Sequence, residues 1–360
     1  MRRHDARATA ASIINFKIEK KELENLVVEE FVVPEEERVG RARHNDAYFD
    51  LVRRLSHQSV VKHFDAYADI DWDSPEFHID LDDPRWELDS DDVLGATEWY
   101  RSQPPPIRSR VGLHMAANFM KIGVIFEYVL KRGLLDFASR LPAGSPEFRY
   151  CYHETIEEAQ HSLMFQEFIN RTGFNIPGLR GLERRGAEFV VKYAHKFPEL
   201  FFVFVLAGED PIDYVQRQTL RKNREDIHPL LRRIMQIHVT EEARHMSFAR
   251  HNLRKRVPEL STTRRARLAL CVPLILGGMA KVMMEASPRI AREYHIPREV
   301  VNAAYLKNPI QQRRMREASS KLFGLCDELG LVNRGSVRLW KVMRISSETE
   351  ASTSTLRNKL

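Results

Sequence analysis

The sequence predicts an all-α protein whose core is a four-helix bundle, extended by additional helices and preceded by an irregular N-terminal arm. Apolar residues recur at helical spacing over most of residues 108–329, and Pro or Gly interrupts the pattern at short intervals. No alternation typical of strands competes with that pattern in this part of the chain. Helices are therefore expected near residues 108–139, 145–172, 181–196, 198–222, 229–256, 263–286, 297–306 and 309–329, with a short one around 337–343.

The N-terminal part of the chain is less regular. Residues 1–42 lack sustained periodicity and are expected to form a flexible or extended arm. Residues 46–64 have helical spacing, and the acidic, aromatic stretch that follows is predicted to be an ordered loop. We expect one helical domain over residues 43–343, with the bundle at about 108–256, and a disordered tail at 344–360.

The composition is that of a globular protein. Of the 360 residues, 43% are hydrophobic and 29% charged, and the basic stretches behind the net charge of +6 alternate with acids. No basic stripe with interleaved aromatics predicts a nucleic-acid surface. The most apolar run, Leu268–Met284, is short for a membrane span and is broken by Pro273, so no membrane segment is expected. Three separated cysteines and no secretion signal fit a cytoplasmic protein without disulfides or thiolate metal sites.

A metal-ligand pattern lies in the segment HVTEEARH, residues 238–245. His238, Glu242 and His245 stand at i, i+4 and i+7 and fall in a narrow arc of one helix face. Apolar neighbours such as Met235 and Met246 indicate that this face is buried. A single Glu-x-x-His arises by chance in a chain with 14 histidines, so the rest of the sequence decides its meaning.

The same ligand set occurs twice in the same order. Glu158-x-x-His161 repeats the motif that ends at His245, and each motif follows, by about thirty residues, a glutamate set among apolar residues, Glu127 or Glu209. Burying an unpaired carboxylate is costly, so these acids need a cation or a hydrogen-bond network. One Glu from each of two helices and one Glu-x-x-His from each of two others is the set with which ferritin-like bundles hold two metal ions. We therefore predict a ferritin-like dinuclear centre, with satisfied core acids as the alternative.

Residues beside these positions are assigned supporting roles. Glu157 and Glu241 each precede a ligand glutamate and are expected to accept the second N–H of the imidazole of the opposite motif, with surface solubility as the alternative. Asp210 is the substitute ligand should Glu209 not face the site. Arg244 lies off the ligand arc and is expected to be an ion-pair partner.

Candidates for substrate contact are weaker. Tyr128, Cys151 and Glu154 lie on or near the helix faces that carry the ligands and could line a cavity, although a core role is the stronger expectation for each. Arg313 is a candidate for pairing with a substrate carboxylate. Tyr128 and Arg313 are retained as the predicted substrate-binding residues.

The donor set also indicates the metal. Carboxylates and imidazoles without thiolates favour two iron ions, with manganese as the alternative. Four carboxylates leave two ferrous ions nearly neutral, which favours O2 as a co-substrate. His238 stands one turn before Glu242, so its imidazole can join the cluster and give four glutamates and three histidines.

This seven-residue pattern resembles that of the AurF-like di-iron N-oxygenases, in which the third histidine lies four residues before the last Glu-x-x-His glutamate. The resemblance covers roughly residues 105–330, and EEAQHSLMF and EEARHMSFAR are its most specific parts. The matching positions are Glu127, Glu158, His161, Glu209, His238, Glu242 and His245.

The resemblance implies a soluble non-haem di-iron monooxygenase that oxidises an amine, commonly an arylamine, through hydroxylamine and nitroso stages to a nitro compound, as in secondary-metabolite biosynthesis. The substrate would be a small-molecule amine, free or carrier-bound. Electrons would come from an external ferredoxin or reductase, because the sequence has no dinucleotide-binding fingerprint. The oligomeric state stays open, with a homodimer as one option.

Two other functions share parts of the pattern. The segment EEARH is similar to the second metal motif of acyl-carrier desaturases, so a di-iron hydroxylase or desaturase acting on a carrier-bound acyl chain is one alternative. His238 argues against it, because that family does not use a histidine there. A ferritin-like metal-binding protein is the other, and the length of 360 residues, with several helices beyond the bundle, favours an enzyme with an enclosed cavity.

Overall fold

The computed structural model describes residues 35–177, 181–194 and 196–346. The chain divides into two compact units, residues 1–44 and 45–360. In the first unit the described residues, 35–44, are helical. Every regular element of the described residues is a helix, so the predicted all-α class is confirmed.

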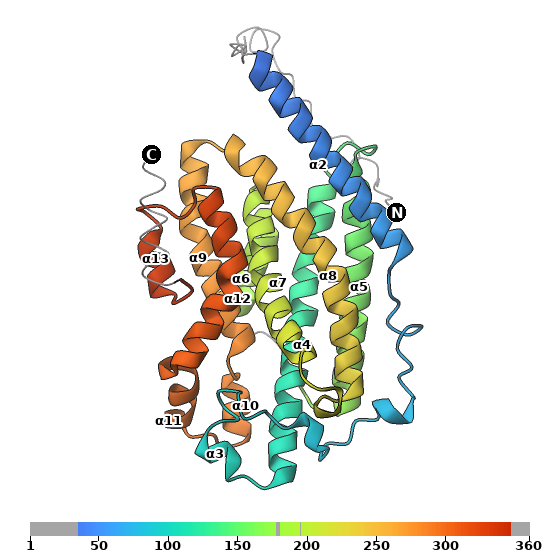
Figure 1. Ribbon diagram of the computed structural model, residues 1–360, viewed down its shortest axis with the longest axis vertical. Helices are drawn as coiled ribbons and strands as arrows, with labels where there is room; N and C mark the ends of the chain where they lie inside the picture. Colours follow the sequence, from blue (N-terminus) through green and yellow to red (C-terminus); the bar gives the residue numbers. More distant parts are fainter. Residues whose placement is uncertain (1–34, 178–180, 195, 347–360) are drawn as a thin grey trace, which may run out of the picture. The chain divides into compact units, whose positions relative to one another are not determined.

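Four long helices form the bundle that the sequence predicted. They are α4 (Pro105–Ala138), α5 (Pro146–Thr172), α7 (Pro198–Leu220) and α8 (Pro229–Arg256). Helix α4 packs along α5 and α7 packs along α8, while α5 also contacts α8 and α4 contacts α7. The four run side by side in Figure 1.

The helix ends follow the local chemistry of the sequence. Pro occupies the first turn of all four bundle helices, where its missing N–H costs no hydrogen bond. The Ser145 side chain caps α5 by accepting from the backbone N–H of Phe148. Helix α5 ends at Gly173, whose φ of 69° is the left-handed conformation that favours glycine.

Helix α7 is the central element of this unit. Its apolar run from Leu200 to Gly208 is buried on all sides, because α4, α6 (Gly181–Ala194), α8, α9 (Thr262–Met284) and α12 (Pro309–Glu328) all pack against it. Residues 45–61 of helix α2 (Glu35–Val61) contribute Tyr48, Val52 and Leu55 to the same core. A helix surrounded in this way holds any polar side chain that it carries away from water.

Two glycines allow α4 and α7 to approach closely at the level of the predicted ligands. A Cβ at Gly208 would lie 2.1 Å from Cζ of Phe126, and a Cβ at Gly133 would lie 2.1 Å from Cε2 of Phe201. Both rings are buried and cannot swing away. Since Phe126 precedes Glu127 and Gly208 precedes Glu209, the contact between Phe126 and Gly208 fixes the positions of the two glutamates along the bundle axis.

The remaining elements of this unit lie outside the four bundle helices. They include α10 (Pro288–Glu293), α11 (Arg298–Val301), a π-helical turn η5 (Asn302–Lys307) and α13 (Val337–Val342). The segment between α2 and α4 contains two short 3-10 turns, η1 (Pro75–Phe77) and η2 (Pro84–Trp86), and the single-turn helix α3 (Glu98–Arg101). Figure 1 shows α9, α12 and α13 beside the bundle.

One boundary and several short elements differ from those that the sequence predicted. Helix α2 begins at Glu35, so residues 35–42 are helical, although they were expected to belong to an irregular arm. Charged residues such as Glu and Arg have high helix propensity, which extends the helix beyond its apolar pattern. Helix α10 and the turns before α4 were not predicted, because each is too short to show a periodicity. Residues 1–34 of the predicted arm (1–42) and residues 347–360 of the predicted tail (344–360) lie outside the described residues.

Two stretches pass a length-and-composition test for membrane spans, Pro105–Ala138 and Thr262–Glu293. Within the protein, 56% and 44% of their apolar windows are buried. The first contains α4 and the second α9, which pack against other helices of the fold. Core helices of globular proteins pass the same test.

Gly208→Ala should lower the free energy of unfolding by about 1–3 kcal/mol, because the added methyl group overlaps the buried ring of Phe126. Denaturant unfolding of the metal-free protein measures the change. Gly186→Ala in α6 is the matched control, since nothing lies within 4 Å of its Cβ position. That substitution should leave stability unchanged or raise it by up to about 1 kcal/mol. Equal effects of the two substitutions would contradict the close crossing of α4 and α7.

Candidate metal centre

The seven predicted ligands all lie in the interior of the bundle. Each is at most 1% exposed to solvent. Helix α4 contributes one of them, α5 two, α7 one and α8 three: Glu127, Glu158, His161, Glu209, His238, Glu242 and His245.

The two Glu-x-x-His motifs face each other across α5 and α8. Nδ1 of His161 lies 3.1 Å from Oε2 of Glu158 and 3.2 Å from Oε1 of Glu242. Nδ1 of His245 lies 3.0 Å from Oε1 of Glu158 and 3.1 Å from Oε1 of Glu242. Both imidazoles therefore direct Nδ1 toward the same pair of carboxylates.

His238 and Glu127 complete one side of this cluster. Nε2 of His238 lies 3.6 Å from Oε1 of Glu127 and 3.7 Å from Oε1 of Glu242. Glu127, His161, His238 and Glu242 each place one potential ligand atom in a common group, and these four atoms all lie within 4.8 Å of one another. A second such group consists of Glu154, Glu158 and His245.

Glu209 faces the same cluster from α7. It is fully buried, and the carboxylates whose charges act on it are those of Glu242, Glu127 and Glu158. The neighbouring Asp210 instead forms an ion pair with Arg250. The structure therefore turns Glu209 toward the site and Asp210 away from it.

A second layer of hydrogen bonds fixes the imidazoles of the two motifs. Nε2 of His161 lies 2.9 Å from Oε2 of Glu241, and Nε2 of His245 lies 2.6 Å from Oε2 of Glu157. Each glutamate thus accepts from the histidine of the opposite helix. Arg244 joins the pair, with Nη2 at 2.8 Å from Glu157 and 3.5 Å from Glu241. Such partners fix the ring orientation and leave the other ring nitrogen for a metal.

His238 has a different hydrogen-bond partner, and it uses Nδ1 for this contact where the other two histidines use Nε2. Its Nδ1 lies 3.0 Å from Oε1 of Gln216, a fully buried residue of α7. When Nδ1–H donates to that amide oxygen, Nε2 carries the lone pair that points into the cluster. The sequence did not predict this role, although Gln216 lies seven residues after Glu209 and hence on the same face of α7.

The pKa values of the carboxyl groups separate into two sets. Burial, together with the neighbouring carboxylates, raises the pKa of Glu127 and of Glu209 well above the ordinary value. Burial also opposes ionisation of Glu158 and Glu242, but the nearby imidazoles outweigh it. The pKa of Glu158 is held well below the ordinary range, and that of Glu242 is lowered to about 2.

The pKa values of the three histidines also fall into two sets. Burial disfavours the imidazolium of His161 and of His245, but the surrounding carboxylates raise the pKa of both well above 6.5. Burial lowers the pKa of His238 to about 4. In the metal-free protein, protons on His161 and His245 therefore offset part of the negative charge, while His238 is neutral.

The unpaired atoms of the cluster fit a pair of cations. Both carboxylate oxygens of Glu127 and of Glu209, Oε2 of Glu242 and Nε2 of His238 are buried without a hydrogen-bond partner among the described residues. Buried polar atoms normally have such a partner, and carboxylates are costly to bury without a cation. A lone pair on His238 that faces two carboxylates is satisfied by a metal ion between them. Oxygen and imidazole donors without thiolate suit iron or manganese.

The two predicted substrate-binding residues lie outside the cluster. Tyr128 does not face the cluster: its side chain is 52% exposed on the outer surface of α4, and its ring contacts Arg132, so its contact with a substrate stays a prediction. Adjacent helical residues point about 100° apart, so burial of Glu127 turns Tyr128 outward. Arg313 lies at the rim of a cavity, but its side chain is 76% exposed and pairs with Glu317 at 2.8 Å.

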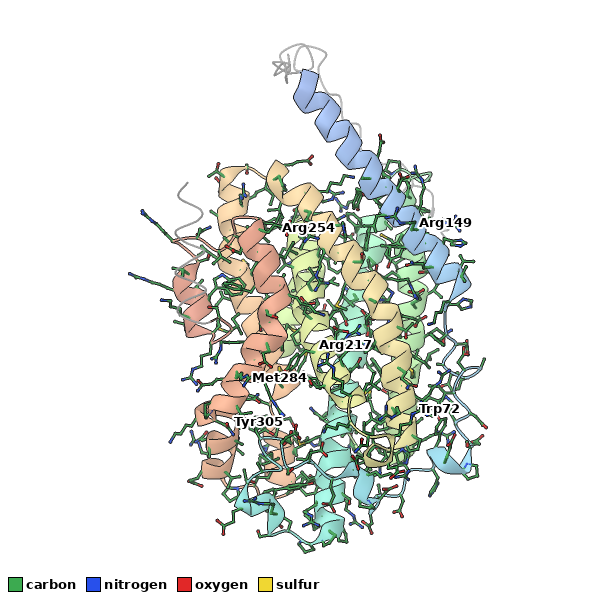
Figure 2. All side chains as sticks on the ribbon, viewed as in Figure 1. Trp72, Arg149, Arg217, Arg254, Met284 and Tyr305 are labelled. Carbon is green, nitrogen blue, oxygen red and sulfur yellow. The ribbon has the colours of Figure 1, made fainter. Side chains whose placement is uncertain are left out.

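A cavity of about 620 Å³ lies at one end of the bundle. Its walls come from α4, α7, α8, α9, α10, α12, η5 and the segment around η2. Five of the eleven methionines line it: Met115, Met120, Met235, Met283 and Met284. Figure 2 labels Met284 and Tyr305, two of its lining residues. None of the seven predicted ligands lines it, but Met235 stands one turn before His238 on α8.

Comparison with known proteins agrees with this arrangement. Residues 45–330 match the family described as p-aminobenzoate N-oxygenase AurF. Proteins of Mycobacterium tuberculosis and Mycobacterium bovis, described only as uncharacterized, are 38% identical to this chain over 301 residues. The matched region covers 84% of this chain and 88% of each relative. No solved structure matches this chain.

Metal affinity should rise with pH between about pH 5 and 8. His161 and His245 have raised pKa values and Glu127 and Glu209 are also protonated more readily than usual, so protons compete with metal ions for these groups at low pH. Calorimetric titration with Mn²⁺ in two buffers of different ionisation enthalpy should detect more than one proton released per protein. A pH-independent affinity without proton release would contradict this assignment.

Proposed function

Because the chain belongs to the AurF family, we propose that it is a non-haem di-iron N-oxygenase that uses O2 to oxidise an amine, in particular an arylamine, through hydroxylamine and nitroso stages to a nitro product. The family implies an oxygenase with a di-iron centre. The finer assignment to amine oxidation in secondary metabolism is our proposal. Manganese is the alternative metal.

The observation that carries this proposal is that four glutamates and three imidazoles from four helices gather in the buried interior of the bundle, with several ligand atoms unpaired. Two iron ions held by them would supply the electrons and the Lewis acidity with which O2 is activated. Glu157 and Glu241 hold the imidazoles of His245 and His161 in place. Gln216 holds a proton on Nδ1 of His238, so that its Nε2 stays available.

The cavity at one end of the bundle is the proposed amine pocket. Its methionine-rich wall offers an apolar and adaptable surface for the body of the substrate. Six of the charged residues that line it form three ion pairs: Arg314 with Asp91, Arg313 with Glu317, and Lys222 with Asp89. Since these charges are already paired, we expect recognition to depend mainly on contact with the methionine-rich wall, and the volume of about 620 Å³ exceeds what a single aromatic ring fills. We propose a bulky apolar amine, free or carrier-bound.

Electrons have to reach the centre from outside this chain. The family pattern implies an external ferredoxin or reductase, and the sequence contains no dinucleotide-binding fingerprint. The net charge of +6 favours encounter with an acidic donor. Association with such a donor should weaken as the salt concentration rises.

His238→Ala should abolish amine oxidation while at least one iron ion is retained. The change removes the lone pair that faces Glu127 and Glu242, and we expect a loss of at least about 100-fold in product formation. The protein would be loaded with Fe²⁺, reduced chemically and exposed to ¹⁸O2 with a panel of arylamines, and mass spectrometry would detect labelled products. His251→Ala, on the same helix but outside the cluster, should retain wild-type activity.

Three results of this experiment would contradict the proposal. Labelled hydroxyl or olefin products from a carrier-bound acyl chain, with no reaction of amines, would favour a hydroxylase or desaturase. Bound iron without any oxygenated product would favour a ferritin-like metal-binding protein. Wild-type turnover by the His238 variant would leave the third histidine without a function.

Ala116→Trp should raise the KM for the amine by about tenfold or more without changing the iron content. Ala116 is half-buried in the cavity wall, so an indole there occupies substrate space. Leu135→Trp, on the exposed outer face of α4, is the control and should leave the KM unchanged. An unchanged KM for Ala116→Trp would place the amine elsewhere.

A further inference from the structure

We propose that Glu154 is an eighth ligand of the metal centre and that its carboxylate oxygen binds the metal position that holds His245. This inference rests on the dinuclear centre proposed above. It goes beyond the seven-residue family pattern, which has no counterpart of Glu154.

The geometry places Glu154 directly beside two of the predicted ligands. It lies on α5 one turn before Glu158, so both carboxylates leave the same face of the helix. An oxygen of Glu154, an oxygen of Glu158 and a ring nitrogen of His245 lie within 4.8 Å of one another. Glu154 is 1% exposed, and its Oε2 has no hydrogen-bond partner among the described residues.

The other buried glutamates of α5 show what a structural carboxylate in this helix looks like. Glu147 pairs with Lys255 at 3.4 Å, and Glu157 pairs with Arg244 at 2.8 Å. No ion pair between the described lysines or arginines and Glu154 is present, and the nearby hydroxyl of Tyr150 is itself without a hydrogen-bond partner in the described part of the chain. In this respect Glu154 resembles Glu127 and Glu209 and differs from Glu147 and Glu157.

The imidazoles are divided unequally between the two groups of ligand atoms, and the oxygen of Glu154 belongs to the group with fewer imidazoles. His161 and His238 belong to one group of ligand atoms, whereas His245 is the only histidine of the other. Glu154 belongs to the group with one imidazole. The two positions would then differ in chemistry, one richer in nitrogen and the other richer in oxygen, and oxygen donors favour harder ions such as Mn²⁺.

The test is a titration of the metal-free, full-length protein with Mn²⁺, followed by calorimetry and by electron paramagnetic resonance. The wild-type protein should bind two ions and give the spectrum of a coupled pair. Glu154→Gln keeps the size of the side chain but removes its charge. It should weaken the binding of one ion by about tenfold or more, leave the other unchanged, and give the signal of isolated Mn²⁺.

Glu147→Gln is the matched control, because it also removes a buried carboxylate from α5 but lies outside the centre. It should bind two ions with wild-type affinities. Two ions bound to Glu154→Gln with wild-type affinities, or an equal loss in both variants, would overturn the role of Glu154. If the wild-type protein binds no pair of ions, the dinuclear centre itself fails.

A second measurement does not depend on the variant folding. Anomalous diffraction from Mn²⁺-loaded wild-type crystals should place a carboxylate oxygen of Glu154 within about 2.0–2.6 Å of the ion nearest His245. An oxygen more than about 3 Å from that ion would overturn the assignment.

Discussion

The structure depends on the cost of placing carboxylates where water cannot reach them. Glu127, Glu154, Glu158, Glu209 and Glu242 are all at most 1% exposed, and no lysine or arginine of the described residues pairs with any of them. Protonation of some of these groups lowers the cost only in part. A pair of metal cations would offset this cost, so metal binding and the stability of the bundle would be coupled.

The frame around the cluster is built so that the ligands cannot turn away from it. Glu157 of α5 accepts from His245 of α8, Glu241 of α8 accepts from His161 of α5, and Arg244 contacts both glutamates. This reciprocal arrangement orients the two imidazoles and also ties the two helices together. On the other side, the glycine contacts between α4 and α7 set the separation of Glu127 and Glu209.

Features that follow from local spacing could be predicted from the sequence, and so could the hydrogen bonds of Glu157 and Glu241 to the histidines of the opposite motif. Other features that depend on the relative placement of helices could not. Pro and Gly marked the ends of the long helices, and the repeated Glu-x-x-His spacing identified the residues that converge. The environment of Glu154 depends on the position of His245, which lies in another helix and far away along the chain. The outward direction of Tyr128 depends on how α4 is rotated in the bundle. The cavity is formed by segments from several helices and a loop that are far apart in the chain, so no single stretch of sequence contains its signal.

The position of the cavity determines from which helices a substrate would approach the cluster. Its lining residues come from α4, α7, α8, α9, α10, α12 and η5, and no residue of α5 is among them in the described chain. Of these, Val215 stands directly before Gln216 in α7, and Met235 stands one turn before His238 in α8. A substrate in this cavity would therefore approach the cluster along α4, α7 and α8, the helices that carry Glu127, Gln216 and His238, and not along α5.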